Sequence, residues 1–81
     1  MLFRSELTVS QHIMRAELVA EILEGKGQFS GARAALMEAD ELLPTAERAY
    51  RLGVLAQRAG NDSQAVNDYE KAVARERDNP L

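Results

Sequence analysis

The chain has no cysteine, no tryptophan and a single histidine, His12, in 81 residues. The absence of cysteine excludes disulfides, thiolate metal sites and thiol nucleophiles. A general acid or base works among groups that tune its pKa, and His12 stands alone near the start of an expected helix, so we interpret it as a solvated or capping residue. Gly25-Lys26-Gly27 lacks the spacing of a phosphate-binding loop, and no acidic cluster has calcium-loop spacing. The sequence therefore predicts a protein that is not an enzyme and has no cofactor or metal.

Long apolar runs and an excess of positive charge are also missing. No apolar run reaches the length that crosses a bilayer, and residues 1–6 become charged too early for a signal peptide. The net charge is -3, which offers nothing to nucleic acid or to an anionic membrane surface. Residues 1–44 carry four basic and seven acidic side chains, whereas residues 45–81 carry six of each. We expect a soluble, cytoplasmic protein that binds neither nucleic acid nor membrane.

What is present is a helical period of apolar residues along almost the whole chain. It predicts helices over residues 10–24, 29–43, 46–59 and 63–77. Thr8 and Gln11 have capping-box spacing, Thr45 is an expected N-cap, and Pro44 stops the helix before it. The short connections make consecutive helices antiparallel. The expected fold is all-α, with two helical hairpins in one domain over residues 1–81.

One pattern occurs twice along the chain, at a spacing of 33 residues. Its members are Val19-Ala20, Gly27, Ala32, Leu36, Ala39 and Pro44, followed by Leu52-Gly53, Gly60, Ala65, Tyr69 and Ala72. Such a period is typical of stacked-repeat proteins, whose surfaces hold other molecules. We expect Ala20 to face Ala32, and Gly53 to face Ala65, where each hairpin crosses most tightly. Leu55, Tyr69, Ala72 and Val73 are expected to contribute to an open end that a third unit would cover.

These residues resemble the tetratricopeptide repeat, although alanine stands at Ala16 and Ala49, where the family has tryptophan. The run Leu52-Gly53, Gly60, Ala65, Tyr69 and Ala72 carries most of the likeness. The resemblance implies one repeat over 10–44, a second over 45–78, and the start of a third over 79–81. Residues 1–9 would form an N-terminal segment, either as a cap or as a dimer contact. The signature positions are Ala20, Gly27, Ala32, Ala39, Pro44, Gly53, Gly60, Ala65, Tyr69 and Ala72.

The resemblance also implies a short α-solenoid in which the first helix of each hairpin lines a concave groove. The groove residues would be Glu17, Glu21, Glu24, Tyr50, Val54, Gln57 and Arg58. The three glutamates share one helical face by their spacing, so a partner docking there would carry basic residues. The alternatives are a solvated acidic face, and for Tyr50 a packing role.

The expected function is that of an adaptor, scaffold or small chaperone that holds a peptide or helix of a partner protein. Two alternatives stay open. In one, the chain self-associates as a structural homo-oligomer through its exposed end faces. In the other, it is a regulatory repeat domain of a larger protein.

Overall fold

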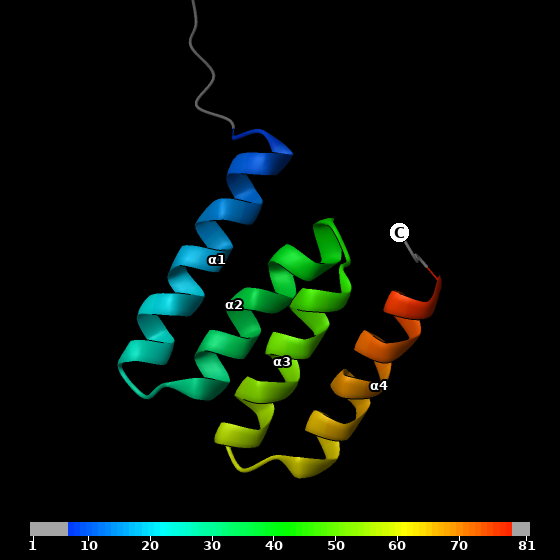
Figure 1. Ribbon diagram of the computed structural model, residues 1–81. Helices are drawn as coiled ribbons and strands as arrows, with labels where there is room; N and C mark the ends of the chain where they lie inside the picture. The colour runs from blue at the N-terminus through cyan, green and yellow to red at the C-terminus, as the bar shows by residue number, and fades with distance from the viewer. Residues whose placement is uncertain (1–6, 79–81) are drawn as a thin grey trace, which may run out of the picture.

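The computed structural model describes residues 7–78, and these form four α-helices (Figure 1). Their bounds are α1 Val9–Gly25, α2 Phe29–Leu42, α3 Ala46–Arg58 and α4 Asp62–Asp78. Helix α1 packs along α2 and α3 along α4, while α2 joins the two hairpins by packing against α3. No strand occurs within residues 7–78. The all-α prediction with two hairpins is confirmed.

Each helix lies within one residue of its predicted bounds, and local chemistry explains the differences. The Thr8 hydroxyl accepts a hydrogen bond from Gln11 N at 3.1 Å, and Thr8 N donates to Gln11 Oε1 at 2.9 Å. Thr8 is therefore the N-cap, and α1 begins at Val9 rather than at residue 10. Helix α2 ends at Leu42 because Leu43 is already extended ahead of the following proline.

The two hairpin turns share one geometry, 33 residues apart. Gly27 and Gly60 adopt φ of 78° and 85°, the left-handed region that glycine enters without a Cβ penalty. Beside them, Gln28 N donates to Leu23 O at 2.9 Å and Asn61 N donates to Ala56 O at 2.8 Å. These bonds satisfy carbonyls at the ends of α1 and α3.

The hydrophobic core lies between the hairpins and is built from small residues and leucines. Its buried cluster consists of Ala20, Ala32, Leu36, Leu52 and Leu55. The expectation that Leu55 belongs to the open end was wrong, since only 2% of it is exposed. Leu55 instead packs from α3 against the first hairpin, where it joins the buried cluster.

Within the second hairpin, Gly53 of α3 packs closely against α4. A Cβ built there would stand 2.5 Å from Tyr69 Cε1, and the three nearest atoms all belong to the Tyr69 ring. The predicted close approach is therefore present, and the atoms nearest to it belong to Tyr69, one helical turn after Ala65. Only glycine leaves room for this ring.

Some expectations fall on the chain ends. Residues 1–6, the larger part of the predicted N-terminal segment, lie outside the described residues, as do residues 79–81. Val9, predicted in that segment, belongs to α1. No helix within residues 7–78 is both long and apolar enough to span a membrane.

Candidate functional site

Two ion pairs join α1 to α3, and they involve three of the predicted groove residues. Arg48 donates to Glu17 Oε2 from Nη2 at 2.9 Å and from Nε at 3.1 Å, and it also donates to the Leu43 carbonyl. Arg58 Nη1 lies 2.8 Å from Glu24 Oε2. Arg48 is buried, whereas half of the Arg58 side chain is exposed. We call the contact between the two hairpins the junction. The Glu17–Arg48 pair lies within the junction, and the Glu24–Arg58 pair lies at its surface.

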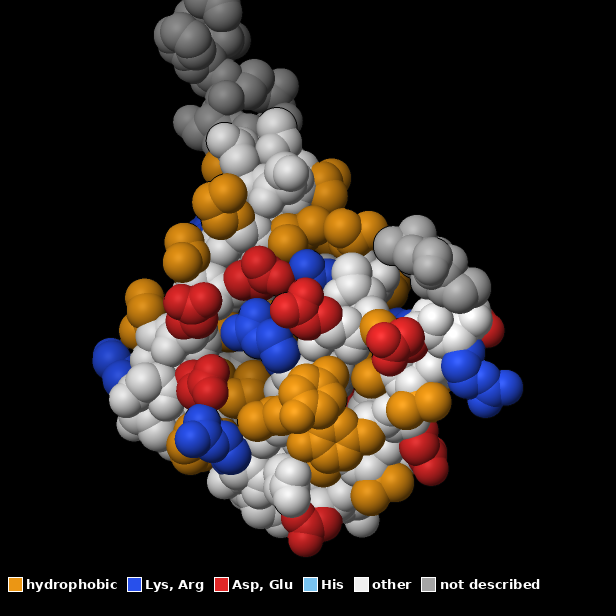
Figure 2. All heavy atoms as spheres, in the orientation of Figure 1, with side chains coloured by type: hydrophobic (Ala, Val, Ile, Leu, Met, Phe, Trp, Pro, Cys, Tyr) orange, Lys and Arg blue, Asp and Glu red, His pale blue; other side chains and the backbone are white. Residues whose placement is uncertain are grey.

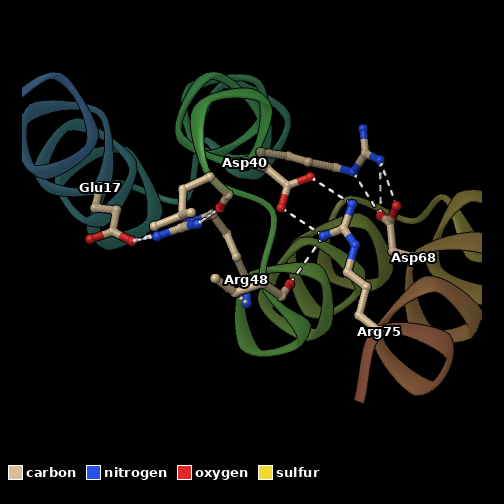
Figure 3. A network of polar contacts seen from close by, with 8 residues as sticks. Glu17, Asp40, Arg48, Asp68 and Arg75 are labelled. Atoms are coloured by element: carbon tan, nitrogen blue, oxygen red, sulfur yellow. Dashed lines mark hydrogen bonds and ion pairs between the residues drawn. The ribbon is translucent and has the colours of Figure 1, made fainter. Parts of the chain in front are cut away.

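Two further ion pairs join α2 to α4 (Figure 3), and their carboxylates are more deeply buried than those of Glu17 and Glu24. Arg33 grips both carboxylate oxygens of Asp68 at 2.9 to 3.0 Å, and Asp68 has no exposed surface. Arg75 donates to both oxygens of Asp40, at 2.8 and 3.2 Å, and to the Thr45 carbonyl at 3.0 Å. Bidentate arginine pairs of this kind are stronger and more specific in geometry than hydrogen bonds between neutral groups. Together the four pairs connect each helix of the first hairpin to its counterpart in the second.

The acidic face expected on α1 is thus largely engaged within the chain. Of the three glutamates, Glu17 and Glu24 bind arginines of α3, and Glu21 is exposed. Among the described residues, every buried side-chain nitrogen and oxygen has a hydrogen-bond partner. A basic partner meeting this face would compete with arginines already in place.

Sequence reasoning missed the roles of Arg33, Asp68 and Arg75. One signal was available, because the four pairs join residues 31 to 35 positions apart, close to the 33-residue period. Opposite charges that recur near one period are candidates for contacts between successive hairpins.

The other predicted groove residues lie together on α3, beside an aromatic pair. The Tyr50 and Tyr69 rings are 5.5 Å apart between centroids and tilted by 42°. The Tyr69 hydroxyl donates to Gln57 Oε1 at 3.0 Å, and Val54 on the same helix is half-buried. Tyr50 packs against Tyr69 on one side yet remains 57% exposed. The Tyr50 ring is therefore held on one side by Tyr69, while more than half of its surface is open to solvent.

Hydrophobic side chains gather over α3 and α4 on the face that Figure 2 shows. A hollow between these helices is lined by Tyr50, Tyr69, Ala72 and Val73 together with Glu47 and Glu76. A second hollow on α4 is also lined by Tyr69 and Val73, with Val66 beside them. We call this continuous surface, formed by Tyr50, Val66, Tyr69, Ala72 and Val73, the α4 face.

The opposite end of the molecule, on the first hairpin, is hollowed as well. A depression between α1 and α2 is lined by His12, Arg15, Ala16, Val19, Ala35 and Glu38. Within residues 7–78, His12 belongs to no group of three or more residues that could hold a metal ion.

Comparison with family models, curated proteins and solved structures finds no match to this chain.

Proposed function

We propose that the chain is a non-enzymatic protein-interaction module of the tetratricopeptide-repeat kind, and that its α4 face receives an α-helix of a protein partner. The observation that carries the proposal is the exposed aromatic and aliphatic surface between α3 and α4. Tyr50 and Val73 are each 57% exposed there. Fully burying a valine-sized side chain contributes about 1.5 to 3 kcal/mol, so covering this surface is favourable.

The family assignment is supported by a turn that recurs at the 33-residue period and by one close contact in the second hairpin. The turn glycines Gly27 and Gly60 share a left-handed backbone conformation. Gly53 accommodates an aromatic ring of α4, and the resemblance gives both Gly53 and Tyr69 signature positions. The repeat boundaries proposed on this basis are 10–44 and 45–78.

A helix is the partner element that suits the α4 face, because the chain already packs a helix on a surface of this kind. Helix α3 lies against α2 and buries Leu52 and Leu55 between the hairpins. The α4 face is formed in the same way, by two antiparallel helices with an apolar hollow between them. Aromatic residues such as Tyr50 are frequent anchors of protein interfaces.

The charges around the α4 face favour a partner with basic residues. Glu47 and Glu76 line the hollow, and Glu70 lines the neighbouring one together with one arginine, Arg77, so carboxylates outnumber the cation. Exposed charges of this kind mainly raise the association rate and set orientation, and salt weakens their effect. The basic partner expected from the sequence is therefore proposed here on carboxylates of α3 and α4.

Two synthetic amphipathic peptides test the proposal. They share one leucine and alanine stripe and carry either lysine or glutamate on the polar face. We expect the lysine peptide to bind in fluorescence anisotropy, more weakly as salt is added, and to shift the amide NMR resonances of α3 and α4. Tyr50→Ala should weaken binding about tenfold or more, since an anchor contributes more than about 1.4 kcal/mol.

Met14→Ala is the matched control, because Met14 is 58% exposed but lies on α1. It should leave peptide affinity unchanged. Failure of both peptides to bind, or binding that Met14→Ala weakens and Tyr50→Ala does not, would contradict the proposed site.

A further inference from the structure

We propose that the helix received by the α4 face is α1 of a second copy of this chain, in a head-to-tail stack that continues the junction between its own hairpins. This inference rests on the proposed function and names the partner. Each residue of the junction has a counterpart on one of two open ends, which are the outer face of α1 and α2 and the α4 face. The comparison uses the 33-residue offset between α1 and α3, and between α2 and α4.

The docking side of the junction is helix α3. Leu52 and Leu55 of α3 are each 2% exposed because they pack into the first hairpin. The residues 33 positions earlier, Val19 and Ile22 of α1, are also apolar but are 40% and 59% exposed. Helix α1 thus presents the apolar residues with which α3 docks, on the end of the molecule that faces away from the second hairpin.

The α2–α4 ion pairs show how the receiving side differs. Inside the junction, Arg33 and Asp40 of α2 receive charged partners from α4. Their counterparts 33 positions later are Val66 and Val73, both exposed members of the α4 face. Two charged residues of α2 thus correspond to two valines of α4.

The residues of a second copy that would meet Val66 and Val73 are apolar as well. The junction partners Asp68 and Arg75 correspond to Ala35 and Leu42 of the first hairpin. Ala35 is half-buried at the open end and Leu42 is 47% exposed. In a head-to-tail stack, Val66 would meet Ala35 of the second copy, and Val73 would meet its Leu42.

This joint change is the main support for a second copy. A charge that faced an apolar residue across the contact would be buried without a partner, which is strongly unfavourable. At both of these positions an ion pair has become an apolar pair, so neither contact leaves such a charge. The two ends therefore match one another in the register that the junction already uses.

The α1–α3 positions and the surrounding charges agree with this orientation. Arg48, which binds Glu17 in the junction, corresponds to Arg15, and Glu17 corresponds to Tyr50. A stacked copy would bring Arg15 onto the exposed Tyr50 ring, a favourable cation–π contact, with Glu47 lining the same hollow.

A head-to-tail contact leaves one open end on each outer chain of a dimer, so the mass should rise beyond two chains as the concentration increases. Sedimentation velocity of the full chain measures this. Val73→Glu disables the receiving end and Ile22→Glu disables the docking end. Each variant alone should remain monomeric, with wild-type helix content by circular dichroism because both positions are exposed.

Mixing the two variants is the decisive step, because each keeps the end that the other has lost. We expect an equimolar mixture to form a complex that stops at two chains. Met14→Glu is the control on α1, since Met14 corresponds to Glu47, a charged side chain that stays exposed beside the junction, and it should associate like wild type. If either variant unfolds, Val66→Glu and Val19→Glu repeat the same design.

Three outcomes would overturn the inference. A wild-type chain that stays monomeric at every concentration has no such contact. A mass that stops at two chains, with Ile22→Glu still dimeric, indicates a two-fold contact between α4 faces. Folded variants that fail to combine exclude the α1-to-α4 contact. Peptide binding at Tyr50 in any of these cases would leave the proposed function standing and remove only the second copy.

Discussion

The junction between the hairpins and the α4 face are both apolar surfaces formed by a pair of helices, but they differ in charge. Four ion pairs cross the junction, whereas Tyr50, Val66 and Val73 stand at three of the corresponding positions of the α4 face. A buried ion pair often contributes no more stability than well-packed apolar residues. We infer that charges specify register within one chain, and that apolar residues supply affinity where the contact must form between chains.

The largest expected effect comes from breaking the most buried pair of the junction. Asp68→Ala removes the carboxylate that Arg33 grips and leaves a largely buried guanidinium without its partner. We expect the free energy of unfolding in urea to fall by about 3 kcal/mol.

The double variant Arg33→Val, Asp68→Ala sharpens the comparison, because it gives the junction the apolar pair found at the open ends. It should be more stable than Asp68→Ala alone. A double variant as unstable as the sum of its two single variants would show that apolar residues cannot replace this pair.

A smaller effect is expected from Gly53→Ala, which tests the packing beneath the α4 face. The new methyl would overlap the Tyr69 ring, and this overpacking should outweigh the gain of about 1 kcal/mol in helix propensity. We expect a net loss of about 1 kcal/mol in thermal unfolding, together with a change in the tyrosine fluorescence. Gly25→Ala is the matched control, because nothing lies within 4 Å of its added carbon. Equal stability of the two variants would contradict the close contact.

The smallest effect is expected at the exposed end of the junction. Glu24→Gln removes the pair with Arg58, whose side chains are 32% and 53% exposed. Such pairs contribute less than about 1 kcal/mol, and salt screens them. We expect a small loss of stability in dilute buffer that disappears in high salt. A loss as large as that of Asp68→Ala would place this pair among the structural ones.

The course of the helices could be predicted from the sequence because their ends depend on local chemistry. Thr8, Thr45 and Pro44 act on backbone groups within a few residues, and Gly27 and Gly60 supply the left-handed turns that follow α1 and α3. Such signals need no knowledge of the neighbouring helices. The helix bounds were accordingly predicted to within one residue.

The contacts between helices were harder to predict, because they depend on the rotation of each helix about its axis. The spacing of Glu17, Glu21 and Glu24 fits a free acidic face as well as a face whose charges bind another helix. Gly53 predicts close packing but does not identify Tyr69 as the residue that fills the space. Aspartate is usually a surface residue, and only the pairing of Asp68 with Arg33 explains its burial.

Amide hydrogen exchange at two protein concentrations tests the central claim most directly, since it reports which helices become covered. We expect protection to increase most in α1 and α4 from the dilute to the concentrated sample, and less in α2 and α3, because the outer helices pack directly on one another in the stack while α2 and α3 contribute only single contacts. Protection of all four helices that is independent of concentration, in samples that differ in mass as measured by light scattering, would contradict the proposed contact between α1 and α4.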